Sequence, residues 1–154
     1  MNTQALIQEF LALNRFAMVG VSRESKDFSR YLFKEFLTHG YDVAPVNPLT
    51  LEINHQLCYP RVGSIDPPVS AALLMTPKRN SEMMVHECFE AGINLLWFYG
   101  ISGMKDVNAD AVRVAEQLGI RVIPGYCPFM FMRTSSWAHK LHGAAWKMLG
   151  KYPR

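Results

Sequence analysis

The chain has 154 residues, which is the size of one ordinary domain, and such a domain buries about 70% of the surface that its unfolded chain exposes. Its net charge of +3 argues against a nucleic-acid-binding protein, because proteins that bind a duplex need several clustered phosphate contacts. Although 49% of the residues are hydrophobic, no run approaches the roughly 20 apolar residues of a membrane span.

The N-terminal residues carry Glu9 among apolar side chains and have no basic leader, unlike a signal peptide. We therefore expect a cytoplasmic protein with neither a membrane nor a nucleic acid as partner. Cys58, Cys88 and Cys127 are odd in number and widely spaced, which fits neither a disulfide framework nor a paired metal site. Reduced thiols are the prediction.

The first predicted strand is the apolar run Phe16–Val19, and a turn follows it that leads into an amphipathic helix. Gly20 permits close approach to the backbone, and the hydroxyl of Ser22 can donate a hydrogen bond. The free N–H groups and the dipole of a helix that starts after such a turn favour a phosphate. The candidate phosphate-binding residues of this segment are Gly20, Val21, Ser22, Arg23, Lys26 and Arg30.

One helix-to-strand connection, the glycine join, recurs along the chain: an amphipathic segment ends in glycine and an apolar run begins directly after it. It occurs at Gly40, Gly92 and Gly119, where glycine suits the position just past a helix end. The apolar runs lack polar alternation, as expected of strands covered on both faces. We predict a single α/β domain over residues 1–154, a Rossmann-like three-layer sandwich with a mostly parallel sheet of five or six strands. The predicted strands are Phe16–Val19, Val43–Val46, Ala71–Met75, Leu95–Phe98 and Val122–Ile123.

The second predicted strand ends at Asn47 and Pro48, and Pro45 inside it predicts a bulge or an early strand end. An NAD enzyme normally has Asp or Glu at this strand end, to hold the ribose hydroxyls. The Gly-x-Gly-x-x-Gly fingerprint is also absent, because Ser22 and Ser25 take its later glycine positions. Both features point away from NAD. Residues 49–70 form a long crossover, in which residues 56–59 are expected to add a short strand.

Later strand ends complete the candidate site, because the ligand of a doubly wound sheet lies beyond the carboxyl ends of its strands. Pro77 ends the strand at 71–75, and Asn80 or Ser81 can cap the next helix. Lys78 and Arg79 add positive charge to the same rim. The predicted ligand-binding residues beyond the first turn are Asn47, Pro48, Thr76, Pro77, Lys78, Tyr99 and Gly100.

Residues 129–154 differ in character from the core at 14–128. Phe129–Met132 is apolar without a period, and Trp137, Leu141 and Met148 mark one face of a helix. We expect this C-terminal helix to pack on the sheet or on a second subunit, as in a homodimer.

In its order of motifs the chain resembles the CoA-binding domain family, the stand-alone relatives of the CoA-binding half of the succinyl-CoA synthetase α subunit. The matching blocks are Val19–Ser22, Gly40–Pro48, Leu96–Phe98 and Gly119–Pro128, of which Gly40–Pro48 is the most specific. The resemblance implies that CoA or an acyl-CoA binds with its phosphates at Gly20–Arg23. It further implies that the nucleoside lies beside Asn47 and Pro48, and that Thr76 and Pro77 lie along the ligand. CoA carries a ribose 3′-phosphate, for which the chain offers the cations Arg23, Lys26, Arg30, Lys78 and Arg79.

No catalytic or metal-binding set stands out, so we interpret the chain as a binding module: a carrier, sensor or regulator. Cys127 is the one candidate nucleophile, and a buried structural thiol is the alternative. Two other functions stay open. One is an NAD(P)-linked oxidoreductase or a subunit of one, suggested by the fold alone, and the other is oligomerisation or partner binding through the C-terminal helix. None of the histidines falls at a predicted strand end; they are His39, His55, His86, His139 and His142.

Overall fold

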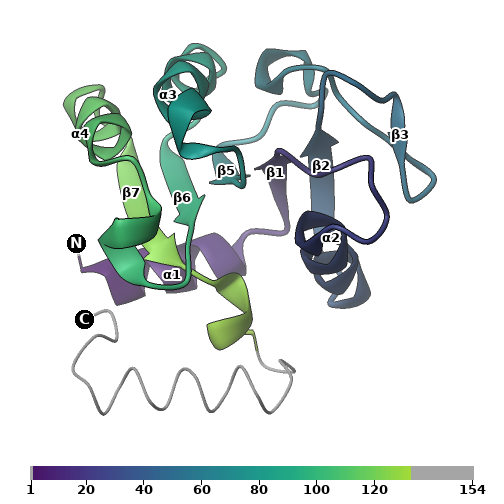
Figure 1. Ribbon diagram of the computed structural model, residues 1–154, viewed down its shortest axis with the longest axis horizontal. Coiled ribbons are helices and arrows are strands. Elements are labelled where there is room, and N and C mark those ends of the chain that lie inside the picture. Colours follow the sequence, from purple (N-terminus) through teal and green to yellow (C-terminus); the bar gives the residue numbers. More distant parts are fainter. Residues whose placement is uncertain (1, 133–154) are drawn as a thin grey trace.

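A parallel sheet in the order β2-β1-β5-β6-β7 organises the computed structural model, which describes residues 2–132 (Figure 1). The strands of this sheet are β1 (Arg15–Val19), β2 (Asp42–Val46), β5 (Ala71–Leu74), β6 (Leu95–Tyr99) and β7 (Arg121–Tyr126). The helices are α1 (Thr3–Ala12), α2 (Phe28–Thr38), α3 (Ser81–Glu90) and α4 (Ala109–Gln117). The predicted Rossmann-like architecture with a parallel sheet is confirmed.

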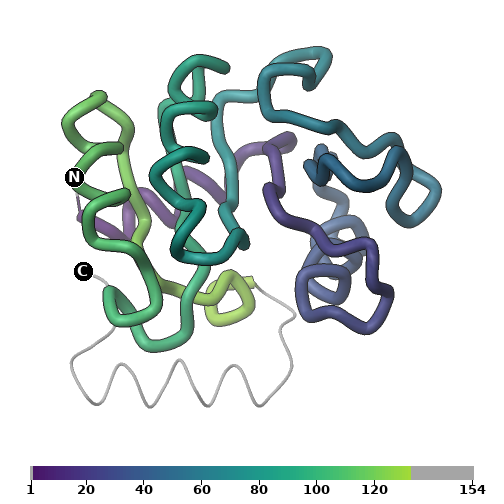
Figure 2. Tube along the Cα trace, turned by 45° about the horizontal axis from the view of Figure 1, so that its top comes forward, coloured from purple at the N-terminus to yellow at the C-terminus, as the bar shows by residue number. Residues whose placement is uncertain are grey.

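Helices cover both faces of the sheet, as Figures 1 and 2 show. Alternate residues of β1 point to opposite sides, so that Phe16 and Met18 join the core under α1 and α2. Ala17 and Val19 join the core under α3 and α4. Two buried cores, one on each face, explain why the strand runs lack polar alternation.

The glycine joins also lie where the sequence predicts them. Gly40, Gly92 and Gly119 each follow a helix by two residues, and a strand begins within three residues. All five strands of the sheet run parallel, so their carboxyl ends lie together along one edge of the sheet, called the carboxyl edge below.

Pro45 causes neither the bulge nor the early end that we expected, since β2 pairs with β1 without interruption as far as Val46. The reason is that β2 is an edge strand. The carbonyl of Pro45 accepts a hydrogen bond from Tyr59 on the open side of β2, so the nitrogen of this residue also faces away from β1.

The crossover at 49–70 contains a small antiparallel hairpin of β3 (Glu52–Ile53) and β4 (Gln56–Leu57). The expected strand at 56–59 is thus shorter, because Tyr59 leaves the hairpin and bridges Val46 of β2. In Figure 2 the hairpin lies beside the segment that connects β1 to α2.

Helix α1 is an element that the sequence analysis did not predict. The side chain of Asn2 caps it by accepting a hydrogen bond from the amide of Ala5 at 2.8 Å. Its buried face packs against β7, and the ring of Phe10 lies 4.8 Å from Phe16 and 5.3 Å from Trp97. This helix closes the core over β6 and β7.

None of the helices at 2–132 has the length and apolar character needed to cross a membrane. The helix expected around Trp137 lies outside the described residues, as do His139 and His142.

Candidate functional site

The turn after β1 is pinned against the ends of its two neighbouring strands. The amide of Gly20 donates to the carbonyl of Val46 in β2 at 3.0 Å. Gly20 has a φ of +90°, and a Cβ added to it would lie 3.1 Å from backbone atoms of Met75 and Thr76. The turn therefore adjoins the carboxyl ends of both β2 and β5.

Side chains from two elements hold the backbone of this turn. Asn47 donates from Nδ2 to the carbonyl of Val21 at 2.9 Å, and its Oδ1 accepts from the amide of Leu49 at 2.8 Å. The amide of Ser22 donates to the hydroxyl of Ser29 at 2.8 Å. Asn47, which the sequence analysis places beside the nucleoside, thus also ties the end of β2 to the turn.

The N-terminus of α2 already holds a carboxylate. Asp27 is its N-cap, and Oδ1 accepts from both the amide and the hydroxyl of Ser29, at 2.8 and 2.6 Å. An anion there would meet this negative charge. A phosphate in this region would therefore depend on the turn and its cations rather than on the helix end that we expected to contribute.

A pocket of about 370 Å³ opens between the ends of β5 and β6. The hydroxyl oxygen of Thr76 is buried in its wall and has no hydrogen-bond partner within residues 2–132. A buried hydroxyl without a partner costs about 1–3 kcal/mol, so this atom fits a polar group of a ligand. The lining residues run from Leu74 to Lys78 and from Tyr99 to Ile101, together with Asp106.

Asp106 was not predicted and organises the loop that borders the pocket. One of its carboxylate oxygens accepts from the amides of Ile101 and Ser102, at 2.7 and 2.6 Å. These hydrogen bonds lower the pKa of the Asp106 carboxyl, and the nearby Lys78 lowers it further. Lys78 itself donates to the carbonyl of Lys105, so its ammonium group links the loop after β5 to the loop after β6.

Tyr99, which is half-buried in the pocket wall, pairs with the buried Cys127. Burial is the main cause that raises the pKa of Tyr99, and its hydrogen bond with Cys127 raises it further. Burial also raises the pKa of the Cys127 thiol to about 11, although the Phe129 amide and Tyr99 act in the opposite direction. Both groups are therefore protonated near neutral pH, and Cys127 is a poor nucleophile there.

We predict that all three thiols resist alkylation in the native protein at pH 8. Cys58, Cys88 and Cys127 are free and buried, and burial raises the pKa of each. For Cys127 a rise from 9.0 to about 11 lowers the thiolate fraction by about a hundredfold. Mass spectrometry after timed iodoacetamide treatment should find modification only when denaturant is added. Rapid single labelling of the native chain would contradict this.

The predicted site residues fall into two groups that meet where Gly20 touches Thr76. The first group is joined by contacts around the turn: Gly20, Val21, Ser22, Arg23, Arg30 and Asn47. The second group lines the pocket: Thr76, Pro77, Lys78, Tyr99 and Gly100. Two of the predicted residues, Lys26 and Pro48, are exposed near the turn.

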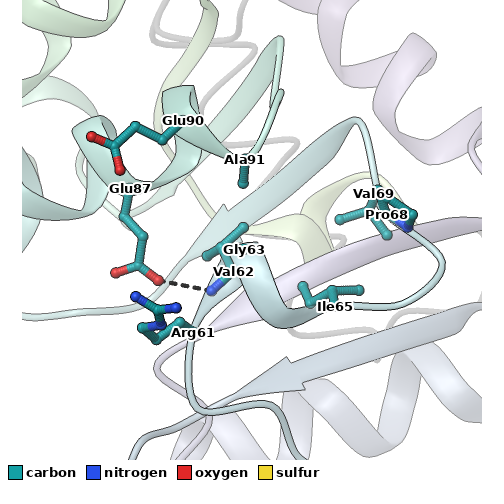
Figure 3. Close-up of a pocket in the computed structure, with 9 residues that line it drawn as sticks. All are labelled: Arg61, Val62, Gly63, Ile65, Pro68, Val69, Glu87, Glu90 and Ala91. Atoms are coloured by element: carbon teal, nitrogen blue, oxygen red, sulfur yellow. Dashed lines mark hydrogen bonds between the residues drawn. The ribbon is translucent and has the colours of Figure 1, made fainter.

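A separate pocket of about 390 Å³ lies near the amino ends of β5 and β6, between η1 (Val62–Ser64) and the end of α3 (Figure 3). There the carboxylate of Glu87 accepts from the amide of Val62 at 2.8 Å, with Arg61 beside them. The predicted site residues lie at the other edge of the sheet. Within residues 2–132, no cluster of His, Cys, Asp and Glu could hold a metal ion.

Comparison with known proteins adds a family match. The model of a family described as CoA binding domain matches residues 14–133. The alpha subunit of acetate–CoA ligase [ADP-forming] II of Pyrococcus furiosus is 26% identical in an alignment of 129 residues that covers 79% of this chain. The chain spans only 28% of the length of that subunit.

Solved structures agree on the fold. A hypothetical protein from Pyrococcus horikoshii OT3 has a TM-score of 0.73 at 24% identity, over 83% of this chain and 87% of its own. A conserved hypothetical protein from Pyrococcus furiosus has a TM-score of 0.64 at 27% identity, over 71% of this chain and 91% of its own. The apo form of the dinucleotide forming acetyl-coenzyme A synthetase 1 from Ca. Korarchaeum cryptofilum also has a TM-score of 0.64 at 27% identity. The match covers 75% of this chain and 27% of that chain.

Proposed function

The chain belongs to the CoA-binding domain family, and from this premise we propose that it binds CoA or an acyl-CoA at the carboxyl edge of its sheet. The buried hydroxyl of Thr76, which has no hydrogen-bond partner within residues 2–132, is the observation that carries the proposal. It lies where the turn after β1 meets the pocket between β5 and β6, so one extended ligand could contact both parts. CoA has this form, with a phosphorylated nucleotide at one end and an uncharged pantetheine arm at the other.

The two parts of the edge differ in chemistry in the way that this ligand requires. Around the turn stand Arg23 and Lys26, both exposed and suited to phosphates. The pocket offers the hydroxyl of Thr76 and the protonated hydroxyl of Tyr99, which suit the amides of the pantetheine arm. We propose that the nucleotide binds at the turn and that the arm enters the pocket.

The proposed role is that of a carrier, sensor or regulatory module. The thiol of Cys127 is protonated near neutral pH and buried, which supports binding rather than covalent catalysis by this residue. An NAD(P)-linked oxidoreductase remains the alternative, and the neutral Asn47 at the end of β2 counts against NAD. A cytoplasmic location and a homodimer are further proposals, and sedimentation analysis would test the second.

Replacing Arg23 with alanine tests the phosphate end of the site. If Arg23 holds the 3′-phosphate, the affinity for CoA should fall about tenfold while that for dephospho-CoA stays the same, since a charged hydrogen bond contributes about 1.5–3 kcal/mol. If Arg23 holds the pyrophosphate, both affinities should fall alike. Titration calorimetry measures both.

Arg113→Ala is the matched control for this experiment. The side chain of Arg113 is 63% exposed and pairs with the nearby Asp110, whereas that of Arg23 is 61% exposed and pairs with the adjacent Glu24. Arg113 belongs to α4 and not to the predicted site. Unchanged affinity for both ligands in Arg23→Ala would remove Arg23 from the site. A wild-type protein that gives heat with NADP but none with CoA would refute the proposed function.

A further inference from the structure

We propose that Arg30 is a positioning residue, which fixes the turn after β1 by linking it to Asn54 at the tip of the β3–β4 hairpin. This inference rests on the proposed function, because the turn is the proposed phosphate site. It gives Arg30 a different role from the direct phosphate contact that the sequence suggests. It also brings Asn54, a residue from a separate part of the chain, into the binding machinery.

The guanidinium of Arg30 is directed at the protein itself. One terminal nitrogen donates to the carbonyls of Ser22 and Arg23, at 3.4 and 3.1 Å. The other terminal nitrogen donates to the side-chain oxygen of Asn54. The Nε atom is buried and has no hydrogen-bond partner within residues 2–132. Three acceptors on two segments thus bind the two terminal nitrogens of the guanidinium, whose planar group holds its N–H donors in a fixed geometry.

These contacts determine which amide of the turn is left for a ligand. In the trans peptide between Ser22 and Arg23, the N–H points away from the carbonyl that Arg30 holds. The amides on either side are already used, since Ser22 donates to the hydroxyl of Ser29 and Glu24 donates to that of Ser22. The N–H of Arg23 has no partner within residues 2–132. Arg30 therefore directs this N–H outward, where a phosphate oxygen could accept from it.

Asn54 suits its place in both backbone and side chain. Its φ is +50°, and that of the adjacent His55 is +63°, so both lie in the left-handed region that asparagine tolerates better than most residues. The hairpin runs beside the segment between β1 and α2 (Figure 2). Asn54 can thus form the tight tip and also present an acceptor to Arg30.

Variants of both partners separate positioning from direct phosphate binding. Lysine keeps the charge but cannot reach three separate acceptors, so Arg30→Lys should lose CoA affinity at least tenfold, as should Arg30→Met. Asn54→Gly keeps the left-handed backbone and removes the acceptor, and we expect a loss of about threefold to tenfold. His55→Gly is the matched control, since the His55 side chain is 99% exposed.

Amide hydrogen exchange of the ligand-free protein gives the decisive readout. In Arg30→Lys and Asn54→Gly, the amides of Ser22 and Glu24 should exchange at least several-fold faster, whereas those of β1 and the melting temperature stay as in the wild type. CoA affinity in Arg30→Lys equal to that of the wild type, or unchanged exchange at both amides, would overturn the inference. If the wild type binds no CoA, the proposed function fails, but exchange still decides the role of Arg30.

Discussion

Gly125→Ala is expected to destabilise the protein by about 3 kcal/mol or more, through left-handed backbone strain and overpacking together. Gly125 in β7 has a φ of +78°, and its added Cβ would lie 2.2 Å from the carbonyl oxygen of Gly103. The contact atom is backbone, so it cannot rotate aside. For a domain of this size the melting temperature should fall by roughly 10 °C.

Gly119→Ala is the matched control, because its φ is also +78° but its added Cβ meets nothing within 4 Å. We expect it to lose only about 1–2 kcal/mol, the cost of the left-handed conformation. Chemical denaturation of both variants measures the difference. Equal destabilisation would show that the loop at 100–106 does not rest on the backbone of β7.

Gly20→Ala should lower the affinity for CoA at least about tenfold, a change of about 1.4 kcal/mol in binding free energy. The added Cβ would lie 3.1–3.2 Å from Met75 and Thr76, which pushes the turn away from the end of β5. Binding suffers because the turn and the pocket must keep their relative positions to contact one ligand. Calorimetric titration with CoA checks the expected loss.

Gly40→Ala separates this effect from backbone strain. Its φ is +86°, close to the +90° of Gly20, and its added Cβ meets nothing within 4 Å. We expect both variants to lose folding stability through the left-handed backbone, Gly20→Ala the more because its Cβ is also crowded, and full CoA affinity only in Gly40→Ala. If both variants bind CoA as the wild type does, the contact between the turn and β5 has no part in binding.

Local patterns in the sequence were sufficient to predict much of the fold and to recognise the family. Continuous apolar runs indicated strands covered on both faces, and a glycine after each amphipathic segment indicated where a helix gives way to a strand. The family match over residues 14–133 confirms the resemblance drawn from those motifs. Helix α1 was missed, although Asn2 as a cap and the buried Leu6, Ile7 and Phe10 carry a helical signal.

The parts of the candidate site that depend on distant contacts could not be predicted from local patterns. Asp106 acts on a pocket that begins at the end of β5, and Asn54 contacts Arg30 from a hairpin 24 residues further along the chain. The bulge or early strand end predicted at Pro45 was wrong because the sequence does not reveal that β2 lies at the edge of the sheet. In each case the three-dimensional neighbour decides the role of the residue, and short-range periodicity contains no information about it.

The central claim is that CoA binds at the carboxyl edge of the sheet, and an NMR titration of isotope-labelled protein with CoA tests it most directly. We predict saturable shift changes at the amides of Gly20, Arg23, Thr76 and Gly100. The absence of shift changes would contradict the account, as would changes confined to the pocket between η1 and α3, whose Glu87 holds the amide of Val62.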